Sequence, residues 1–128
     1  MAPQTFYFIL FILTTIFVVR RILQQRNVPH YSPSQLEARM KATGMVLLDV
    51  RTKSERSVQH IAGSIHIPLN ELAARLQELK NFPGREIVCY CQTGARSARA
   101  VALLLKNGLS AANLRGGIAE WNFYKMAK

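Results

Sequence analysis

The chain has 128 residues, which is enough for one domain with a short appendage. Its 17 lysine and arginine residues outnumber 7 acidic residues and give a formal charge of +10, but they are spread along the chain. No nucleic-acid-binding motif accompanies this charge, so we expect no nucleic-acid partner. Two cysteines in a C-x-C arrangement cannot build a disulfide framework, and metal-ligand spacings are absent. We therefore expect a reduced compartment, no metal and no cofactor.

The N-terminal segment is a candidate membrane anchor. Ala2–Val19 contains no charged residue, and its 18 residues would reach roughly 27 Å as a helix, just short of a hydrocarbon core of about 30 Å. Ile22 and Leu23 extend the span if Arg20 and Arg21 turn outward. A cleaved signal peptide is the rival interpretation. It needs a basic start and a small-residue cleavage site, and the sequence has neither.

The charges beside this segment predict its orientation. Arg20, Arg21 and Arg26 all follow the apolar run, so the positive-inside rule places the rest of the chain in the cytoplasm. The polar stretch 24–29 is typical of a short linker. We expect a single-pass membrane protein divided into an anchor with its basic flank, residues 1–27, and a domain, residues 28–128.

The first half of the domain alternates helical and extended patterns. Ser32-Pro33-Ser34-Gln35 predicts a helix start with serine at the N-cap, and the helix should run to about Thr43, where Gly44 ends it. The apolar run Met45–Val50 predicts a fully buried strand. A short strand is predicted at Ser64–Ile67.

The next elements lead to the cysteines. Asn70 is predicted to cap a helix that ends at Pro83-Gly84. The core side of this helix should carry Leu72, Leu76 and Leu79. Ile87–Tyr90 then has the apolar, β-prone composition of a buried strand.

The last third predicts two helices and a strand. A helix should present Ala98, Val101, Ala102 and Leu105 on one face and stop at Gly108. Leu114 should begin a brief strand before Gly116-Gly117, and a final helix should place Trp121 in the core. Strands separated by helices predict a parallel α/β sheet, whose site lies beyond the C-terminal strand ends.

Cys91 lies at such a strand end, in a tight turn that leads into a helix. A loop of this kind directs several backbone N–H groups at one centre, where the helix dipole adds partial positive charge. We therefore expect the thiolate of Cys91, which is the reactive nucleophile, to be favoured. The simpler alternative is a cysteine that merely ends a buried strand.

Four segments in this order carry a resemblance to a known family. They are Leu48–Arg51 with Glu55, His60–Pro68, Cys91–Arg96, and Leu114–Gly117 with Trp121. Together they resemble the single-domain rhodaneses, which are thiosulfate sulfurtransferases. The resemblance implies a three-layer α/β/α fold around a five-stranded parallel sheet, with Cys91 as the catalytic residue that carries a persulfide. The Val58 region departs from the family, which often has an aromatic and acidic stretch there.

The expected reaction is the transfer of a sulfane sulfur. The Cys91 thiolate would attack the outer sulfur of thiosulfate or a persulfide donor, and sulfite would leave thiosulfate. The persulfide would then pass its sulfur to a thiophilic acceptor such as cyanide or a thiol. Backbone N–H groups of the loop are expected to bind the transferred sulfur. These substrate-binding residues are Gln92, Thr93, Gly94, Ala95 and Arg96.

We expect the side chains near Cys91 to bind the substrate or support the loop rather than to react. Arg96 and Arg99 lie three positions apart at the helix start, and we favour a site role for Arg96 and a solvated position for Arg99. Asp49 and Arg51 are expected to support the loop by hydrogen bonds rather than take part in the chemistry. Cys89 should point to the same face of the sheet as Cys91 but into the core.

Two other functions stay open. A cysteine phosphatase or arsenate reductase of the related fold is associated, by resemblance, with a C-x5-R loop. The spacing from Cys91 to Arg96 is C-x4-R, a smaller cradle that suits sulfur better than a tetrahedral phosphate. A non-catalytic, membrane-tethered docking module of the rhodanese type usually lacks the cysteine that is present here.

Overall fold

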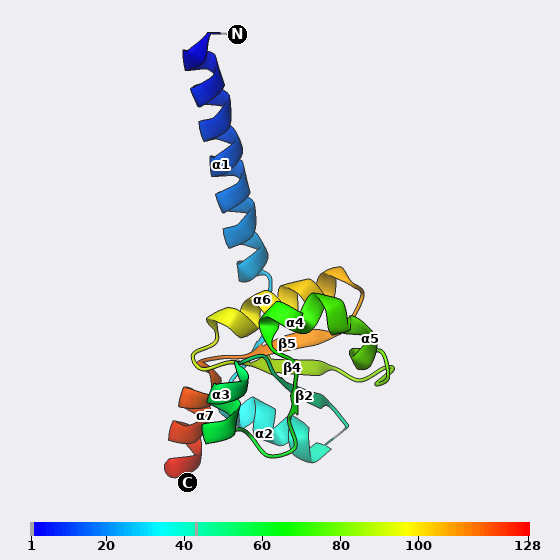
Figure 1. Ribbon diagram of the computed structural model, residues 1–128. Coiled ribbons are helices and arrows are strands. Elements are labelled where there is room, and N and C mark those ends of the chain that lie inside the picture. Colours follow the sequence, from blue (N-terminus) through cyan, green and yellow to red (C-terminus); the bar gives the residue numbers. More distant parts are fainter. Residues whose placement is uncertain (1, 43) are drawn as a thin grey trace.

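The computed structural model describes residues 2–42 and 44–128 (Figure 1). Thr43, where the first helix of the domain was expected to end, lies outside the described residues. The elements in chain order are α1 (Pro3–Arg26), β1 (His30–Tyr31), α2 (Pro33–Ala42), β2 (Val46–Asp49), α3 (Lys53–Val58), β3 (Ile65–His66), α4 (Leu69–Leu72), the 3-10 turn η1 (Ala73–Arg75), α5 (Leu76–Leu79), β4 (Ile87–Tyr90), α6 (Ala95–Lys106), β5 (Ala111–Leu114) and α7 (Gly117–Met126).

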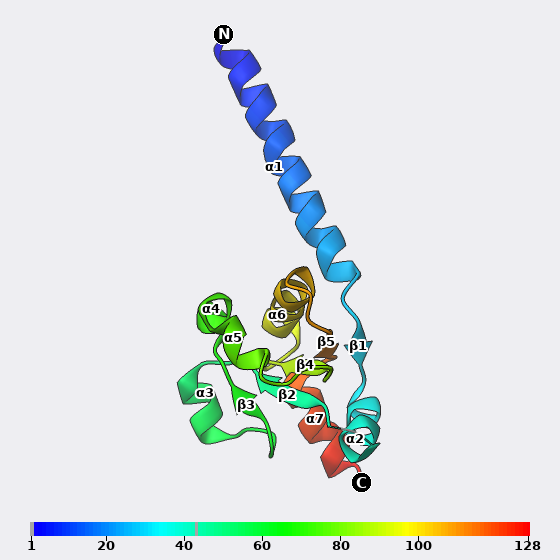
Figure 2. The same cartoon turned by 90° about the vertical axis from the view of Figure 1, so that its right-hand side faces the viewer.

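The strands form one parallel sheet in the order β1-β5-β4-β2-β3. The central strand β4 places Cys89 between Leu48 of β2 and Asn113 of β5. Helices α4, α5 and α6 cover one face of the sheet, and α2 and α7 cover the other (Figures 1 and 2). The predicted α/β/α architecture with five parallel strands is therefore confirmed.

Each face of the sheet has its own apolar core. Successive side chains of a strand point to opposite faces, so Leu48 and Cys89 pack with Val101 of α6, while Val88 packs with Trp121 of α7. All of these side chains are buried, including Trp121, as predicted. The two cores hold the C-terminal ends of β2 and β4 side by side.

The buried face of α6 differs from the predicted one. Ala98 and Val101 are buried as expected, but Leu105 is 40% exposed whereas Leu104 is fully buried. The helix begins at Ala95, directly after the loop. Gly94 precedes it with φ +107°, a left-handed conformation that glycine adopts at little cost.

Two predicted boundaries were also wrong. The helix expected at Asn70 begins at Leu69, after Pro68, and it breaks into α4, η1 and α5. Proline pre-sets the backbone for this start, so Asn70 lies inside the first turn instead of capping it. Leu114 ends β5 instead of beginning it, because Ala111 is already paired with Ile87 of β4.

Two short elements were not predicted. The edge strand β1 has only two residues, too few to show an alternating pattern. Helix α3 starts with a capping box in which Thr52 and Glu55 satisfy each other's backbone N–H groups. The predicted cap of α2 does form, because Gln35 N–H donates to the Ser32 hydroxyl and Ser32 N–H donates to the Gln35 side chain.

Helix α1 projects away from the layer formed by α4 and α6 (Figures 1 and 2). Within it, Pro3–Leu23 is long and apolar enough to cross a membrane, and none of this stretch is buried. Only Asn27 separates the end of α1 from Val28, which is 4% exposed and packs in the core. The carbonyl of Pro29 then accepts a hydrogen bond from Asn113 N–H at 2.8 Å.

The core analysis predicts the effect of truncating a buried leucine. Leu48 is completely buried in the central part of the sheet, so Leu48→Ala should lower the free energy of unfolding by about 2–5 kcal/mol. Val58 is 87% exposed, and Val58→Ala should change it by less than about 0.5 kcal/mol. Denaturant unfolding of the detergent-solubilised chain, followed by Trp121 fluorescence, measures both. Similar losses in the two variants would contradict this assignment of the core.

Candidate active site

Cys91 directly follows the central strand β4, and its side chain is 1% exposed. The Gly94 N–H donates to Cys91 Sγ at 3.1 Å, and the Ser97 hydroxyl lies 3.3 Å from the same sulfur. The N–H groups of Thr93 and Ser97 also face it. The sulfur therefore lies at a centre of hydrogen-bond donors at the start of α6.

These donors set the acidity of the thiol. Burial raises the pKa of Cys91, but hydrogen bonds from Ser97, Gly94 and Thr93 outweigh it, so the pKa lies below its ordinary value. Cys89 is completely buried on the same face of the sheet, where burial and the neighbouring Cys91 raise the pKa of its thiol. Of the two cysteines, Cys91 is the one whose thiolate is stabilised.

The start of α7 holds the other side of the loop backbone. The Cys91 carbonyl accepts from Ile118 N–H at 2.9 Å, and the Gln92 carbonyl accepts from Ala119 N–H at 3.2 Å. Gly117 permits this close approach, because a Cβ at Gly117 would lie 2.5 Å from each of the two carbonyl oxygens. The carbonyl groups thus point toward α7 and away from the sulfur.

Two buried polar side chains that the sequence analysis missed complete the loop. The single proton of the Ser97 hydroxyl has two acceptors within reach, Cys91 Sγ and, at 2.5 Å, Asn113 Oδ1. Asn113 Nδ2 donates to the Gly94 carbonyl at 3.1 Å. Asn113 Nδ2 also lies 3.2 Å from His30 Nδ1. A serine on the apolar face of α6 and a single amide in the apolar strand β5 were the signals that could have identified them.

Arg96 is held by a carboxylate from α3. Its two terminal nitrogens lie 2.7 and 2.8 Å from the two oxygens of Glu55. The Arg96 guanidinium, with smaller contributions from Thr52, lowers the pKa of Glu55 to about 2 despite partial burial. The sequence motif included Glu55 but assigned it no role. The Arg96–Glu55 ion pair connects the N-terminus of α3 to the loop that contains Cys91.

Asp49 and Arg51 support a different part of the site. Arg51 donates to Asp49 from its backbone N–H at 2.9 Å and from its buried guanidinium at 2.9 and 3.1 Å. Tyr90 O–H, next to Cys91 in the chain, donates to Asp49 at 3.0 Å. Burial favours protonation of Asp49, but the Arg51 hydrogen bonds outweigh it and lower the carboxyl pKa. The network fixes the segment that leads into α3 and reaches the loop through Glu55.

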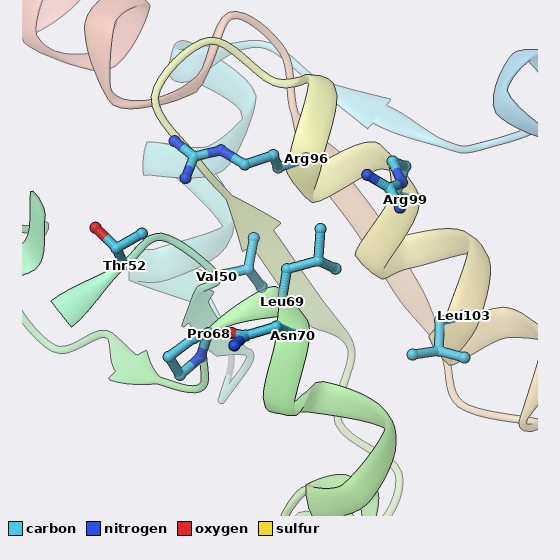
Figure 3. Close-up of a pocket in the computed structure, with 8 residues that line it drawn as sticks. All are labelled: Val50, Thr52, Pro68, Leu69, Asn70, Arg96, Arg99 and Leu103. Carbon is cyan, nitrogen blue, oxygen red and sulfur yellow. The ribbon is translucent and has the colours of Figure 1, made fainter.

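A groove of about 600 Å³ opens beside the loop, between α4 and α6 (Figure 3). Its lining consists of Val50, Thr52, Pro68, Leu69, Asn70, Arg96, Arg99 and Leu103. Val50 N–H donates to the Tyr90 carbonyl at 3.1 Å, which places Val50 level with Cys91. Arg99, expected to be solvated, is exposed but borders this groove together with Arg96.

The groups that commonly bind metals are dispersed. Among the described residues, no cluster of three or more histidine, cysteine, aspartate or glutamate side chains could hold a metal ion.

Comparison with known proteins identifies the same region. A family model for the rhodanese-like domain matches residues 32–123. A sulfurtransferase of Allochromatium vinosum is 38% identical over 78 residues, which are 60% of this chain and 71% of that protein.

Solved structures agree with this match. A rhodanese-related protein from Thermoplasma volcanium superimposes with a TM-score of 0.69 at 32% identity, over 75% of this chain and 92% of that one. A thiosulfate sulfurtransferase from Pseudomonas aeruginosa gives a TM-score of 0.72 at 29% identity, over 78% of this chain but only 20% of that longer chain.

The donors around the sulfur predict a change in its titration. Loss of a hydrogen bond to a charged group costs about 1.5–3 kcal/mol, so Ser97→Ala should raise the pKa of Cys91 by about one to two units. Thr93→Ala removes an exposed side chain but keeps the backbone donor, and it should leave the titration nearly unchanged. Thiolate absorbance against pH measures both variants. Equal shifts would show that the Ser97 hydroxyl does not stabilise the thiolate.

Proposed function

The chain belongs to the rhodanese-like domain family, and from this premise we propose that it is a sulfurtransferase acting through a persulfide on Cys91. The observation that carries the proposal is the position of the Cys91 sulfur, which faces the N–H groups of Thr93, Gly94 and Ser97 and has a lowered pKa. A nucleophilic thiolate is then available without a general base. The proposed reaction requires neither metal nor cofactor.

The first half-reaction loads the enzyme with sulfur. The Cys91 thiolate attacks the outer sulfur of thiosulfate, a new S–S bond forms, and the old S–S bond breaks with its electron pair leaving on sulfite. The negative charge stays on the Cys91 persulfide. Backbone N–H groups of Gln92–Arg96 then surround the added sulfur and stabilise its charge, as oxyanion-hole donors do.

The second half-reaction returns the enzyme to its thiolate. A thiophilic acceptor, such as cyanide or a thiol, attacks the outer sulfur and takes it, and the S–S electron pair returns to Cys91. Asp49 and Arg51 act in this proposal as structural support, because their hydrogen bonds fix the segment that carries Glu55. Glu55 in turn fixes Arg96 at the loop.

The phosphatase alternative is weaker for a specific reason. A phosphate bound in the loop would need the terminal nitrogens of Arg96, since paired donors match the oxygens of a phosphate. In this chain both nitrogens already donate to Glu55. The C-x4-R loop and this ion pair both favour a small sulfur substrate.

We further propose that residues 1–27 are a retained membrane anchor and that residues 28–128 form the catalytic domain. Support comes from the unburied apolar helix Pro3–Leu23 and from Arg20, Arg21 and Arg26, which follow its apolar part. By the positive-inside rule the domain faces the cytoplasm, where a thiol stays reduced.

The persulfide mechanism predicts a mass change on one cysteine. Purified protein treated with thiosulfate should gain one sulfur atom, and cyanide should remove it. Cys91→Ser should abolish both the mass gain and turnover, whereas Cys89→Ser should keep most of each, because Cys89 is buried with a raised pKa. Intact-mass spectrometry and a thiocyanate assay provide the measurements. Equal loss in two folded variants would overturn the single-thiol mechanism.

The anchor predicts how the protein behaves in membranes. It should remain with membranes through high salt and alkaline washing, because apolar burial holds it. A membrane-impermeant thiol reagent should label Cys91 after lysis but not in intact cells. A chain without residues 1–27 should be soluble and retain sulfur transfer, since the described loop and groove lie beyond Val28. A mature protein that begins near Arg20 would show a cleaved signal instead.

A further inference from the structure

We propose that the outward face of α6 binds the anionic lipid headgroups of the membrane in which α1 is anchored. Arg99 and Lys106, both exposed on this helix, would make the contact. The inference rests on the proposed membrane anchor at residues 1–27. It adds a second attachment to the same membrane, in which charge orients the domain while apolar burial holds the anchor.

The connection between α1 and the domain brings α6 to the membrane surface. Val28, the second residue after α1, packs in the core cluster that also contains Val101 and Leu104 of α6. Helix α1 itself contacts α6. Figures 1 and 2 show the C-terminal end of α1 beside the layer of α4 and α6, whereas α2 and α7 lie on the far side of the sheet. The layer that contains α6 is therefore the side of the domain nearest to the lipid.

The length of chain after the apolar segment sets the depth of this contact. The candidate membrane span ends at Leu23, and α1 ends at Arg26. The residues between these two ends add only about 4.5 Å along the helix axis. The headgroup layer on one side of a bilayer is roughly 5–8 Å thick, which is half the difference between the whole bilayer and its hydrocarbon core. The part of α6 beside the end of α1 therefore lies at the level of the headgroups.

The outward face of α6 carries positive charge that no carboxylate compensates. The sequence of this helix contains arginine and lysine but no acidic residue. Arg96 donates to Glu55, whereas Arg99 and Lys106 take part in none of the ion pairs found among the described residues. Arg99 and Lys106 are nearly two helical turns apart, so they lie on the same side of the helix. They form a cationic line on the surface of the domain.

The other helices that cover the sheet have their cations paired. Beside α6, Arg75 lies between α4 and α5 and pairs with Glu71 and Glu78. On the far side of the sheet, Glu37 pairs with lysines of α2 and of the C-terminal segment. Of the helices that cover the two sheet faces, as far as the structure describes them, α6 alone carries cations outside ion pairs. Its charge is therefore available to an anionic partner.

An anionic membrane surface matches this face. The cytoplasmic leaflet is negatively charged, and each lysine or arginine near it strengthens binding by about fivefold. Two cations would hold a free protein only weakly, but α1 already keeps α6 at the surface, so the contact forms within one anchored molecule. The attraction falls off within a Debye length of about 10 Å at 0.1 M salt and about 3 Å at 1 M salt. High salt should therefore release α6 from the headgroups while the apolar anchor stays inserted.

Lysine labelling of the full-length protein tests the contact. The protein is reconstituted into nanodiscs of phosphatidylcholine alone or of phosphatidylcholine mixed with anionic phosphatidylglycerol. Acetic anhydride, an uncharged reagent, is added briefly, and the acetylation of each lysine is measured by peptide mass spectrometry. The labelling rate of Lys106 is divided by that of Lys125, which belongs to α7 on the far side of the sheet. This ratio reports how far the headgroups cover the outward face of α6.

The proposal predicts a change that depends on lipid charge and on Arg99. Two cations at about fivefold each predict that the ratio falls by about 25-fold in anionic discs relative to neutral discs. Arg99→Gln removes one of the two cations and should leave a fall of about fivefold. Lys41→Gln removes an exposed cation from α2 on the far side of the sheet and should leave the full effect. Salt at about 1 M should abolish the difference between the two kinds of disc.

The outcomes separate this inference from the anchor on which it rests. Equal ratios in neutral and anionic discs would overturn the binding of α6 to headgroups and leave the anchor intact. Protection of Lys106 that persists in full in Arg99→Gln, or that Lys41→Gln reduces equally, would also overturn it, because a general attraction of a basic protein would then suffice. A chain that stays soluble without detergent and does not enter nanodiscs would overturn the anchor, and this inference with it.

Discussion

The site depends on the direction in which the loop peptides point. The Cys91 and Gln92 carbonyls accept hydrogen bonds from N–H groups at the start of α7. The Gly94 carbonyl accepts one from the side chain of Asn113. The Gln92 carbonyl and the Thr93 N–H belong to one peptide, so holding the carbonyl toward α7 turns this N–H toward Cys91. Burial alone would make this thiol a weaker acid than a free cysteine. Hydrogen bonds from Ser97, Gly94 and Thr93 reverse this effect and lower the pKa of Cys91.

Hydrogen bonds around Asp49 and the start of α3 also stabilise the loop. Asp49 is completely buried and is satisfied by Arg51, Arg56 and Tyr90, which together order the backbone that leads into the Thr52–Glu55 capping box. Removal of one partner from such a buried pair typically costs about 3–5 kcal/mol, because the other charge is left uncompensated. Glu55 is thereby oriented to accept hydrogen bonds from Arg96. The loop thus contacts α3 through this ion pair and α7 through its backbone carbonyls. Arg99, by contrast, is exposed at the groove.

The sequence predicted the main features because they depend on local patterns. The apolar run at Ile87–Tyr90, the turn after it and the alternation of strands with helices were sufficient for the parallel sheet and for the position of Cys91. Contacts between distant segments could not be predicted in this way. Asn113 reaches the loop only because β5 pairs with β4, and Glu55 reaches Arg96 only because β2, which leads into α3, pairs with β4, which leads into the loop. The exposed position of Leu105 was missed because the predicted face counted only apolar residues, whereas the buried face of α6 also includes Ser97 and is turned toward Leu104.

The single residue between α1 and the buried Val28 leaves almost no slack in the chain, since one residue spans at most about 3.6 Å. For an anchored protein, the domain would be held against the lipid surface by the face from which α1 leaves, which is also the layer of α4 and α6 (Figure 2). Its encounters with other membrane proteins would then be governed by surface density and lateral diffusion. A dissolved reactant would approach the groove only through the thin aqueous layer beside the headgroups, where local ion composition differs from that of the bulk cytoplasm.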